Sequence, residues 1–493
     1  MNPQSSAKHR RPDTRQPASQ ALGGVASRAL MWSFVNTAVS RLGTLTIGIV
    51  LARLLGPEAF GTFAVATVAL VAVLSFNELG VSLAVVRWQG DPKAIAPTVT
   101  TISVVSSLLL TIGAYFAAPS FAAAMGDPSA ADVIRLMMLC ILINGIVATP
   151  AALLQREFLQ GRRMVADQVN VWVGAILSVG LALTGMGAMS LAIGRLTGTV
   201  LAAILFIRYS PLPLRFGFDR LQARHLLKFG LPLAGSSIIV FAVGYADQLT
   251  AGAMLGTTAL GYYVLAFNLA SWPVSMFSQP LRSVAPAAFS RLQHDRTAMT
   301  GALRSIIGLL AAVTVPICLL LAGAAVPIID VVYGQVWAPA APVLTWLAIL
   351  AAFRILFELA YDYLVVLGRS HIIFTIQVIW LVVLIPGLLL GASMWGLSGL
   401  AGVQVFIAAL VVVPLYLWEF RKSGLKVSAV GRRARLPVAA GVLVGVAAVG
   451  VSKIVHQQLL ACVVAGIVCV VAVALLLHRD RVELAAVRTL GVA

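Results

Sequence analysis

Three arginines stand near the middle of long apolar segments of this chain: Arg41, Arg195 and Arg354. A charged side chain at the centre of a bilayer costs about 2.5–3.5 kcal/mol on insertion scales, so such a residue usually faces a cavity or a partner. Because guanidinium groups bind phosphate oxygens in a bidentate manner, these three arginines suit a basic cavity for a diphosphate. The alternative is that a nearby acid neutralises each arginine, and that these pairs only hold helices together.

Four acidic residues also lie in apolar segments: Glu78, Asp247, Glu358 and Asp362. Arg354, Glu358 and Asp362 follow each other at intervals of four residues, so they share one face of a helix. Such a stripe is typical of a cavity wall, although Glu358 could instead pair with Arg354. Glu78 or Asp247 could take up a proton or Na⁺ to drive exchange, or could form a gate pair with an arginine.

The elements that must position these residues are membrane-spanning helices. Of the 493 residues, 60% are hydrophobic and only 11% are charged, a composition that indicates an all-α polytopic membrane protein. Apolar runs of about 18 residues or more predict spanning helices. We predict about 14 spans, near residues 31–53, 62–86, 98–118, 134–154, 168–187, 188–207, 229–253, 261–284, 305–327, 341–366, 371–391, 393–417, 436–453 and 458–478.

The net charge of +18 is explained by the distribution of lysine and arginine over the connections. Basic residues gather in the amino-terminal tail and then in alternate connections, among them the stretches 208–228 and 421–435. The positive-inside rule makes these connections cytoplasmic. Both termini are therefore expected inside, with a disordered basic tail over residues 1–27, and no nucleic-acid partner is expected.

An internal repeat points to two similar halves. Residues 55–66 read LGPEAFGTFAVA and residues 255–266 read LGTTALGYYVLA, with five identities and no gap. Two lobes in pseudo-twofold repeat are a common plan for a transporter, because they can rock about a site between them. We expect a tail at 1–27, a six-helix lobe at 28–207, a cytoplasmic linker at 208–230, a second six-helix lobe at 231–420, and two additional helices with a tail at 421–493.

Motifs for catalysis are not found in the sequence. The six histidines are scattered without metal-ligand spacing, and no phosphate-binding GxxxxGK[ST] loop is present. The four cysteines lie inside apolar spans, where they pack as small hydrophobic residues. We therefore predict no catalytic residue, no metal and no cofactor, and we do not expect an enzyme.

Several segments resemble the polysaccharide-transport flippases of the MOP superfamily, over about the first 370 residues. The resemblance is nearest to the type that exports colanic acid and teichuronic acid. Its motifs are turns and loops, so Arg41, Arg195 and Arg354 are assigned from their place in the spans. The matching segments are LARLLGPEAFGTFAVA (Leu51–Ala66), NELGVSLAVVR (Asn77–Arg87), PAALLQREFLQGRRMVADQ (Pro150–Gln168) and PAAFSRLQHD (Pro286–Asp295).

This resemblance implies a flippase that moves an oligosaccharide on an undecaprenyl diphosphate carrier across the bacterial cytoplasmic membrane by alternating access. The implied partners are the lipid-linked oligosaccharide, the bilayer, a polysaccharide polymerase and chain-length proteins. Two alternatives stay open: another transporter of the superfamily, such as a lipid II flippase or a drug–cation antiporter, and a membrane polymerase or ligase.

Overall fold

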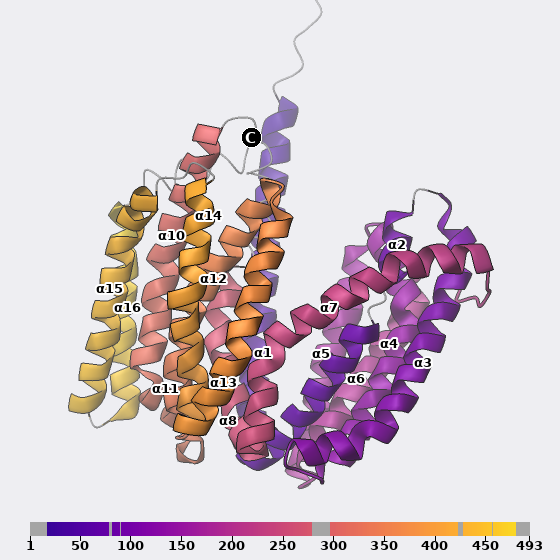
Figure 1. Ribbon diagram of the computed structural model, residues 1–493, viewed down its shortest axis with the longest axis horizontal. Helices are drawn as coiled ribbons and strands as arrows, with labels where there is room; N and C mark the ends of the chain where they lie inside the picture. Colours follow the sequence, from indigo (N-terminus) through magenta and orange to yellow (C-terminus); the bar gives the residue numbers. More distant parts are fainter. Residues whose placement is uncertain are drawn as a thin grey trace, which may run out of the picture.

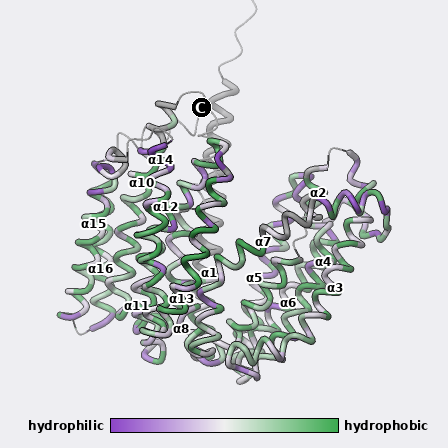
Figure 2. Tube along the Cα trace, in the orientation of Figure 1, coloured by the Kyte–Doolittle hydropathy of each residue, from purple (hydrophilic) through white to green (hydrophobic). Residues whose placement is uncertain are grey.

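The computed structural model describes residues 17–77, 81–88, 90–278, 296–422, 427–455 and 457–479. Its regular elements in this part of the chain are all helices, arranged as two bundles side by side (Figure 1). Hydrophobic residues follow the lengths of the helices, and hydrophilic residues gather mainly at their ends (Figure 2). This distribution is typical of helices that cross a bilayer.

The first lobe contains α1 (Pro17–Asn77), α3, α4, α5 and α6, with the short α2 at one end. Helix α1 begins at Pro17, inside the stretch 1–27 that was predicted as a tail, and residues 1–16 lie outside the described residues. Helices α5 and α6 pack along each other, and α4 packs on α3 and α6. The remaining bounds are Val81–Arg87 for α2, Pro92–Ala124 for α3, Ala130–Arg156 for α4, Gln160–Leu183 for α5 and Ala188–Tyr209 for α6.

The second lobe contains α7, α8 with the π-helical η1, α10, α12 and α13, which continues through η3 into α14. Helix α12 contacts α8, α10 and α13 and so lies at the centre of this lobe. The bounds are Arg220–Leu255 for α7, Thr257–Pro273 for α8, Val274–Ser278 for η1, Arg296–Gly323 for α10, Ala325–Val332 for α11, Gln335–Trp337 for η2, Ala340–Val366 for α12, Ser370–Ile407 for α13, Ala408–Val412 for η3 and Val413–Lys422 for α14.

The last two helices, α15 (Val427–Ile454) and α16 (Gln458–Arg479), pack on α10 and α11 at the outer side of the second lobe. Close approach of α15 to α10 depends on small residues. A Cβ atom on Gly323 of α10 would overlap the carbonyl oxygen of Gly445, and one on Gly441 would lie 2.8 Å from Val315. Gly441 and Gly445 of α15 form a GxxxG pair, which therefore lies in a helix–helix contact, as such motifs do in other membrane proteins.

Two of the long helices are each two crossings joined at a glycine. Eleven of the described helices are long and apolar enough to cross a membrane. Of these, α1 is interrupted at Gly56 (φ 71°) and α13 at Gly396 (φ 58°), where the positive φ favours glycine. With α8 and η1 counted as one further crossing, the described chain has 14, which confirms the predicted all-α fold of two six-helix lobes and two extra helices.

The repeat seen in the sequence has a matching backbone conformation. Gly56 has φ 71° and ψ 175°, and Gly256, 200 residues later, has φ 85° and ψ 173°. The structure adds a second equivalent pair that the sequence did not reveal. Gly187, before α6, has φ 57° and ψ −137°, and Gly396, within α13, has φ 58° and ψ −140°. The two lobes therefore share helices and turns.

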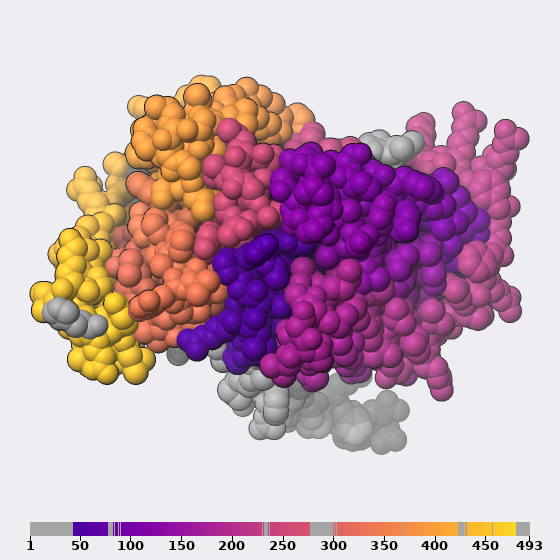
Figure 3. Space-filling view, turned by 90° about the horizontal axis from the view of Figure 1, so that it is seen from below, coloured from indigo at the N-terminus to yellow at the C-terminus, as the bar shows by residue number. Residues whose placement is uncertain are grey.

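The two copies of the repeat touch each other at the end of the molecule drawn lowest in Figure 1, here called the lower end. A Cβ atom on Gly61 would overlap the carbonyl oxygen of Thr257, and one on Gly261 would overlap that of Pro57. These two contacts are related by the same offset of 200 residues. Figure 3 views this end, where atoms of α1 adjoin those of the α7–α8 region.

Helix α7 links the lobes. Its first turns belong to the first lobe, because Leu226 is buried in a cluster with Val85, Val99 and Leu153. Its later turns pack on α8 and α13 of the second lobe. The helix is continuous through residues 230 and 231, where the linker was predicted to end. Toward the upper end of Figure 1 the other helices of the two lobes diverge.

Candidate functional site

Two of the predicted site residues lie wholly or partly outside the described structure. Glu78 is outside the described residues. Arg41 lies in α1, but its side chain is outside the described part. The other five predicted side chains are described, and the structure brings Asp247 and Arg354 into one neighbourhood. Arg195 lies separately, in α6 of the first lobe.

Arg195 is exposed at the surface of the first lobe, on the side of α7. Its guanidinium is close enough to Tyr245 of α7 and to Cys140 of α4 to interact electrostatically with both. Arg195 therefore lies near helices of both lobes. Tyr245 itself stacks on Phe241, with ring centroids 5.1 Å apart. A cation at this place is available to a ligand between the first lobe and α7.

Asp247 belongs to a buried hydrogen-bond network of the second lobe. Tyr263 of α8 donates to the Asp247 carboxylate at 2.6 Å, and the Gln404 amide of α13 donates to the Tyr263 hydroxyl oxygen at 2.7 Å. All three side chains are buried, and the Asp247 carboxylate also accepts the backbone N–H of Gln248. Asp247 was predicted from its charge, whereas Tyr263 and Gln404 were missed.

The described residues of the first lobe form no equivalent of this network. The offset of 200 residues places Ile47 and Phe63 opposite Asp247 and Tyr263. Gln404 follows Gly396 by eight residues, as Arg195 follows Gly187. Arg195 and Gln404 therefore occupy equivalent positions, one exposed and charged, the other neutral and buried. The polar residues of the two lobes differ where the backbones agree.

Arg354 of α12 lies over an aromatic ring. Its Cζ atom is 5.4 Å from the centroid of Phe267 of α8, the geometry of a cation–π contact. Its charge also acts on Asp247 and Tyr263. Further along α12, Glu358 is half-buried and Asp362 is buried. Arg354 thus borders the polar network of the second lobe.

A cavity of about 350 Å³ lies between α1 of the first lobe and α8 of the second. Thr44 and Gly48 of α1 face Asn268, Ser271 and Trp272 of α8. The Trp272 Nε1 atom is buried and has no hydrogen-bond partner among the described residues.

The position of Arg41 in α1 relates it to this cavity. Arg41 precedes Thr44, Leu45 and Gly48 by three, four and seven residues, the spacing of one helix face. These three later residues line the cavity. The backbone register therefore places Arg41 one turn beyond the cavity, toward the upper end.

At the lower end, Trp337 closes the contact between the lobes. This fully buried side chain donates its Nε1 hydrogen to the Ala52 carbonyl oxygen of α1 at 3.2 Å. Its ring meets Phe60 of α1 and Tyr262 of α8 edge to face, with centroids 5.6 and 5.8 Å apart. One aromatic residue thus joins elements of both lobes.

Arg53 also bridges the lobes at this end. Its Nε atom donates to the Val332 carbonyl oxygen at 2.7 Å, and its Nη2 atom donates to the Val331 carbonyl oxygen. From sequence, a span-end arginine is expected to extend to lipid headgroups. Arg53 instead satisfies the carbonyls that end α11, because an arginine can donate in two directions at once.

Asp127, in the turn between α3 and α4, ties that turn to the repeat. The Thr62 hydroxyl of α1 donates to the Asp127 carboxylate at 2.7 Å. Burial alone raises the pKa of Asp127, but hydrogen bonds from Ser129, Thr62 and backbone amides outweigh it and lower the pKa below the ordinary value. In the second copy of the repeat, the residue equivalent to Thr62 is Tyr262. Its hydroxyl donates to the Val336 carbonyl oxygen at 3.3 Å.

The comparisons with known proteins agree with the resemblance described above. A family model described as "Polysaccharide biosynthesis protein" matches residues 50–342. The chain belongs to this polysaccharide biosynthesis family. The family resemblance inferred from the sequence motifs is therefore confirmed.

Two proteins with similar sequences are named for polysaccharide biosynthesis. The succinoglycan biosynthesis transport protein ExoT of Rhizobium meliloti (strain 1021) is 29% identical over 333 residues, which are 66% of this chain and 65% of that protein. The lipopolysaccharide biosynthesis protein WzxC of Escherichia coli (strain K12) is 22% identical over 370 residues, 75% of each chain. The chain thus spans somewhat less than two thirds of ExoT.

Among solved structures, the lipid II flippase MurJ in an inward closed conformation has the same fold. The TM-score is 0.75 at 14% sequence identity, and the match covers 91% of this chain and 100% of MurJ. At this identity the likeness concerns the fold alone. The likeness of the fold includes helices beyond residue 342.

Proposed function

We propose that this protein is a flippase that moves an oligosaccharide linked to undecaprenyl diphosphate across the cytoplasmic membrane of a bacterium. The family match over residues 50–342 carries this proposal, because the relatives ExoT and WzxC are named for the biosynthesis of succinoglycan and lipopolysaccharide. The two-lobe fold supports alternating access, in which repeat-related halves rock about a site between them.

The membrane orientation follows from charge. Arg156, Arg208 and Arg215 are among the basic residues at the upper end, whereas the described basic residues near the lower end are Arg53, Arg135 and Lys453. By the positive-inside rule the upper end is cytoplasmic, and both termini are inside. The Trp337 and Arg53 contacts then close the outer side in this conformation. The lobes diverge toward the cytoplasm, from which the ligand would enter.

The arginines supply the affinity for the diphosphate in this proposal. Arg195 lies between the first lobe and α7, Arg41 belongs to the helix that lines the cavity near Trp272, and Arg354 borders the second lobe's network. The diphosphate is the part of the ligand that cannot enter oil unaided, and guanidinium groups bind its oxygens in pairs. The polar lining of the cavity suits the hydroxyl groups of a sugar.

The acidic residues supply the coupling or gating step. Asp247 is the best placed of them, because Tyr263 and Gln404 fix its carboxylate while Arg354 is within electrostatic reach. Exchange of a proton or Na⁺ at such a carboxylate would change the charge beside Arg354. We assign Glu78, Glu358 and Asp362 the same kind of role as gate or coupling acids.

The function is tested by deleting the gene and following lipid-linked intermediates. We expect the undecaprenyl-diphosphate oligosaccharide to accumulate on the inner leaflet, with loss of a surface or secreted glycan made by a polymerase and chain-length proteins. Unchanged glycan without an accumulated intermediate would exclude the proposal. Accumulation of lipid II instead would favour a second candidate, a lipid II flippase, which the fold likeness to MurJ supports.

A further inference from the structure

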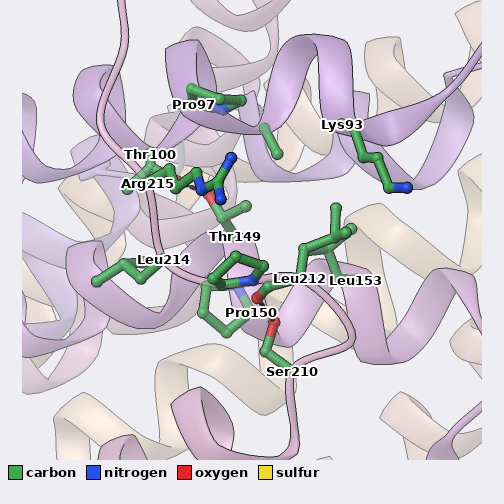
Figure 4. A pocket seen from close by; sticks show the side chains of 12 residues that line it. Lys93, Pro97, Thr100, Thr149, Pro150, Leu153, Ser210, Leu212, Leu214 and Arg215 are labelled. Atoms are coloured by element: carbon green, nitrogen blue, oxygen red, sulfur yellow. Dashed lines mark hydrogen bonds between the residues drawn. The ribbon is translucent and has the colours of Figure 1, made fainter.

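A second cavity, of about 320 Å³, lies at the upper end of the first lobe, away from the proposed transport path. It is enclosed by α3, α4 and the segment 210–219, which links α6 to α7. Lys93, Thr149 and Arg215 are among its lining residues, and Figure 4 shows Thr149 beside Arg215 with Lys93 at the opposite side. This cavity contains none of the residues assigned to the transported ligand.

The linking segment is a fixed wall of this cavity. The Thr101 hydroxyl donates to the Gly217 carbonyl oxygen at 2.8 Å, and the backbone N–H groups of Gly217 and Asp219 donate to the Thr101 and Thr98 hydroxyl oxygens at 3.1 and 3.2 Å. A Cβ atom on Gly217 would lie 2.9 Å from Pro97, so only glycine fits this approach to α3. These contacts hold Arg215 of the same segment at the cavity.

The polar groups in the cavity favour an anion. The Thr100 and Thr149 side chains are buried and share one hydrogen bond of 2.9 Å. Two hydroxyls have two hydrogens, and only one is used by this bond. The other has no acceptor among the described residues, so a donor is left in the cavity. With the cations Lys93 and Arg215, the cavity offers hydrogen-bond donors and positive charge to oxygen atoms.

The remaining surface favours a ligand with an apolar part. Pro150, Leu153 and Leu212 line the cavity beside the polar groups. On the linking segment, Gly217 turns inward, while its neighbours Phe216 and Phe218 are 64% and 67% exposed. Aromatic side chains next to basic residues are typical of the headgroup level of a bilayer. A free phosphate ion would not use these apolar contacts.

We propose that this cavity binds the phosphate headgroup of an anionic phospholipid from the leaflet at the upper end. Arg215, Lys93 and the free hydroxyl hydrogen of the Thr100–Thr149 pair hold the phosphate oxygens, and Phe216 and Phe218 enter the acyl region. Anionic lipids of the cytoplasmic leaflet are drawn to basic segments of this kind. The site needs only the membrane location of the protein and not the identity of the transported ligand.

The test measures which lipids stay with the full-length protein. The protein is purified from vesicles of phosphatidylglycerol and phosphatidylcholine with the same acyl chains, and bound lipid is counted by native mass spectrometry. We expect retained phosphatidylglycerol to fall about tenfold in the double variant Lys93→Ala/Arg215→Ala, given the attraction per basic residue near a membrane. The control, Arg220→Ala/Arg224→Ala, removes the same charge from α7 outside the cavity and should change retention less than about twofold.

Three results would overturn the proposal. Equal losses in the two double variants would show diffuse attraction and no site, and unchanged retention in the cavity variant would show that the cavity binds no lipid. Displacement of phosphatidylglycerol by millimolar inorganic phosphate would make a free phosphate the ligand. If the cavity variant does not fold, Thr100→Val/Thr149→Val carries the test, because it removes both hydroxyl hydrogens at nearly constant volume and should weaken retention by itself.

Discussion

Replacement of Gly61 by alanine should open the lower end of the molecule. The added methyl group would overlap the carbonyl group of Thr257, and the next nearest group is the Gly261 nitrogen at 3.4 Å. Both are backbone groups, so no side-chain rotation can relieve the overlap. Overpacking of this kind costs about 1–3 kcal/mol, which lowers the ratio of closed to open molecules about 5- to 150-fold.

The assay is the labelling rate of a single cysteine introduced at Leu260, which is fully buried at the lower end. In a chain without its four native cysteines, a maleimide that does not cross membranes is applied outside the cells. We expect the cysteine to be labelled about 5- to 150-fold faster in Gly61→Ala than in the protein with Gly61. Gly180→Ala in α5 is the matched control, because its added methyl group meets nothing within 4 Å. Equal rates in the two variants would refute the view that the glycine contact holds this end closed.

Three further changes test other parts of the structure. Tyr263→Phe leaves the buried Asp247 and Gln404 groups without their partner and should lower the free energy of unfolding by about 1–3 kcal/mol, measured by thermal unfolding in detergent. Arg195→Ala at normal protein level should abolish glycan export, and Arg195→Lys should restore part of it, because lysine keeps the charge without the bidentate geometry. Since the folded-state pKa of Asp127 lies below 3.8, its contribution to stability should be full above that pH and disappear only as the pH falls through the lowered value; loss of this contribution at pH 5–6 would contradict the assignment.

The sequence predicts the helices better than the contacts between them. Apolar runs reveal the spans because each must satisfy its own backbone in lipid. The repeat at Gly56 and Gly256 can be recognised in the sequence because residues around both turns are identical. The pair Gly187 and Gly396 cannot be recognised in this way, because few residues around these two glycines agree. Their equivalence rests on backbone angles that no residue type specifies.

In the candidate site, too, some residues can be predicted from the sequence and others only from the tertiary structure. Asp247 is conspicuous because a charge in a span is costly. Tyr263 and Gln404 are neutral, and uncharged polar residues in spans are too common to single out without knowing what they face. Arg53 was expected to extend to headgroups, and only the three-dimensional position of the α11 carbonyls explains its bonds. Which residues meet across the lobes depends on tertiary packing that has no local sequence pattern.

The equivalence of Arg195 and Gln404 means that the two halves of the chain cannot stand in for each other. A protein assembled from two copies of the first half would carry two such cations and no buried network around an acid. One assembled from two copies of the second half would carry two networks and no cation at that place. At this pair of positions the first half has an exposed cation and the second half a buried hydrogen-bond network, so a ligand lying across both would meet different groups at its two ends.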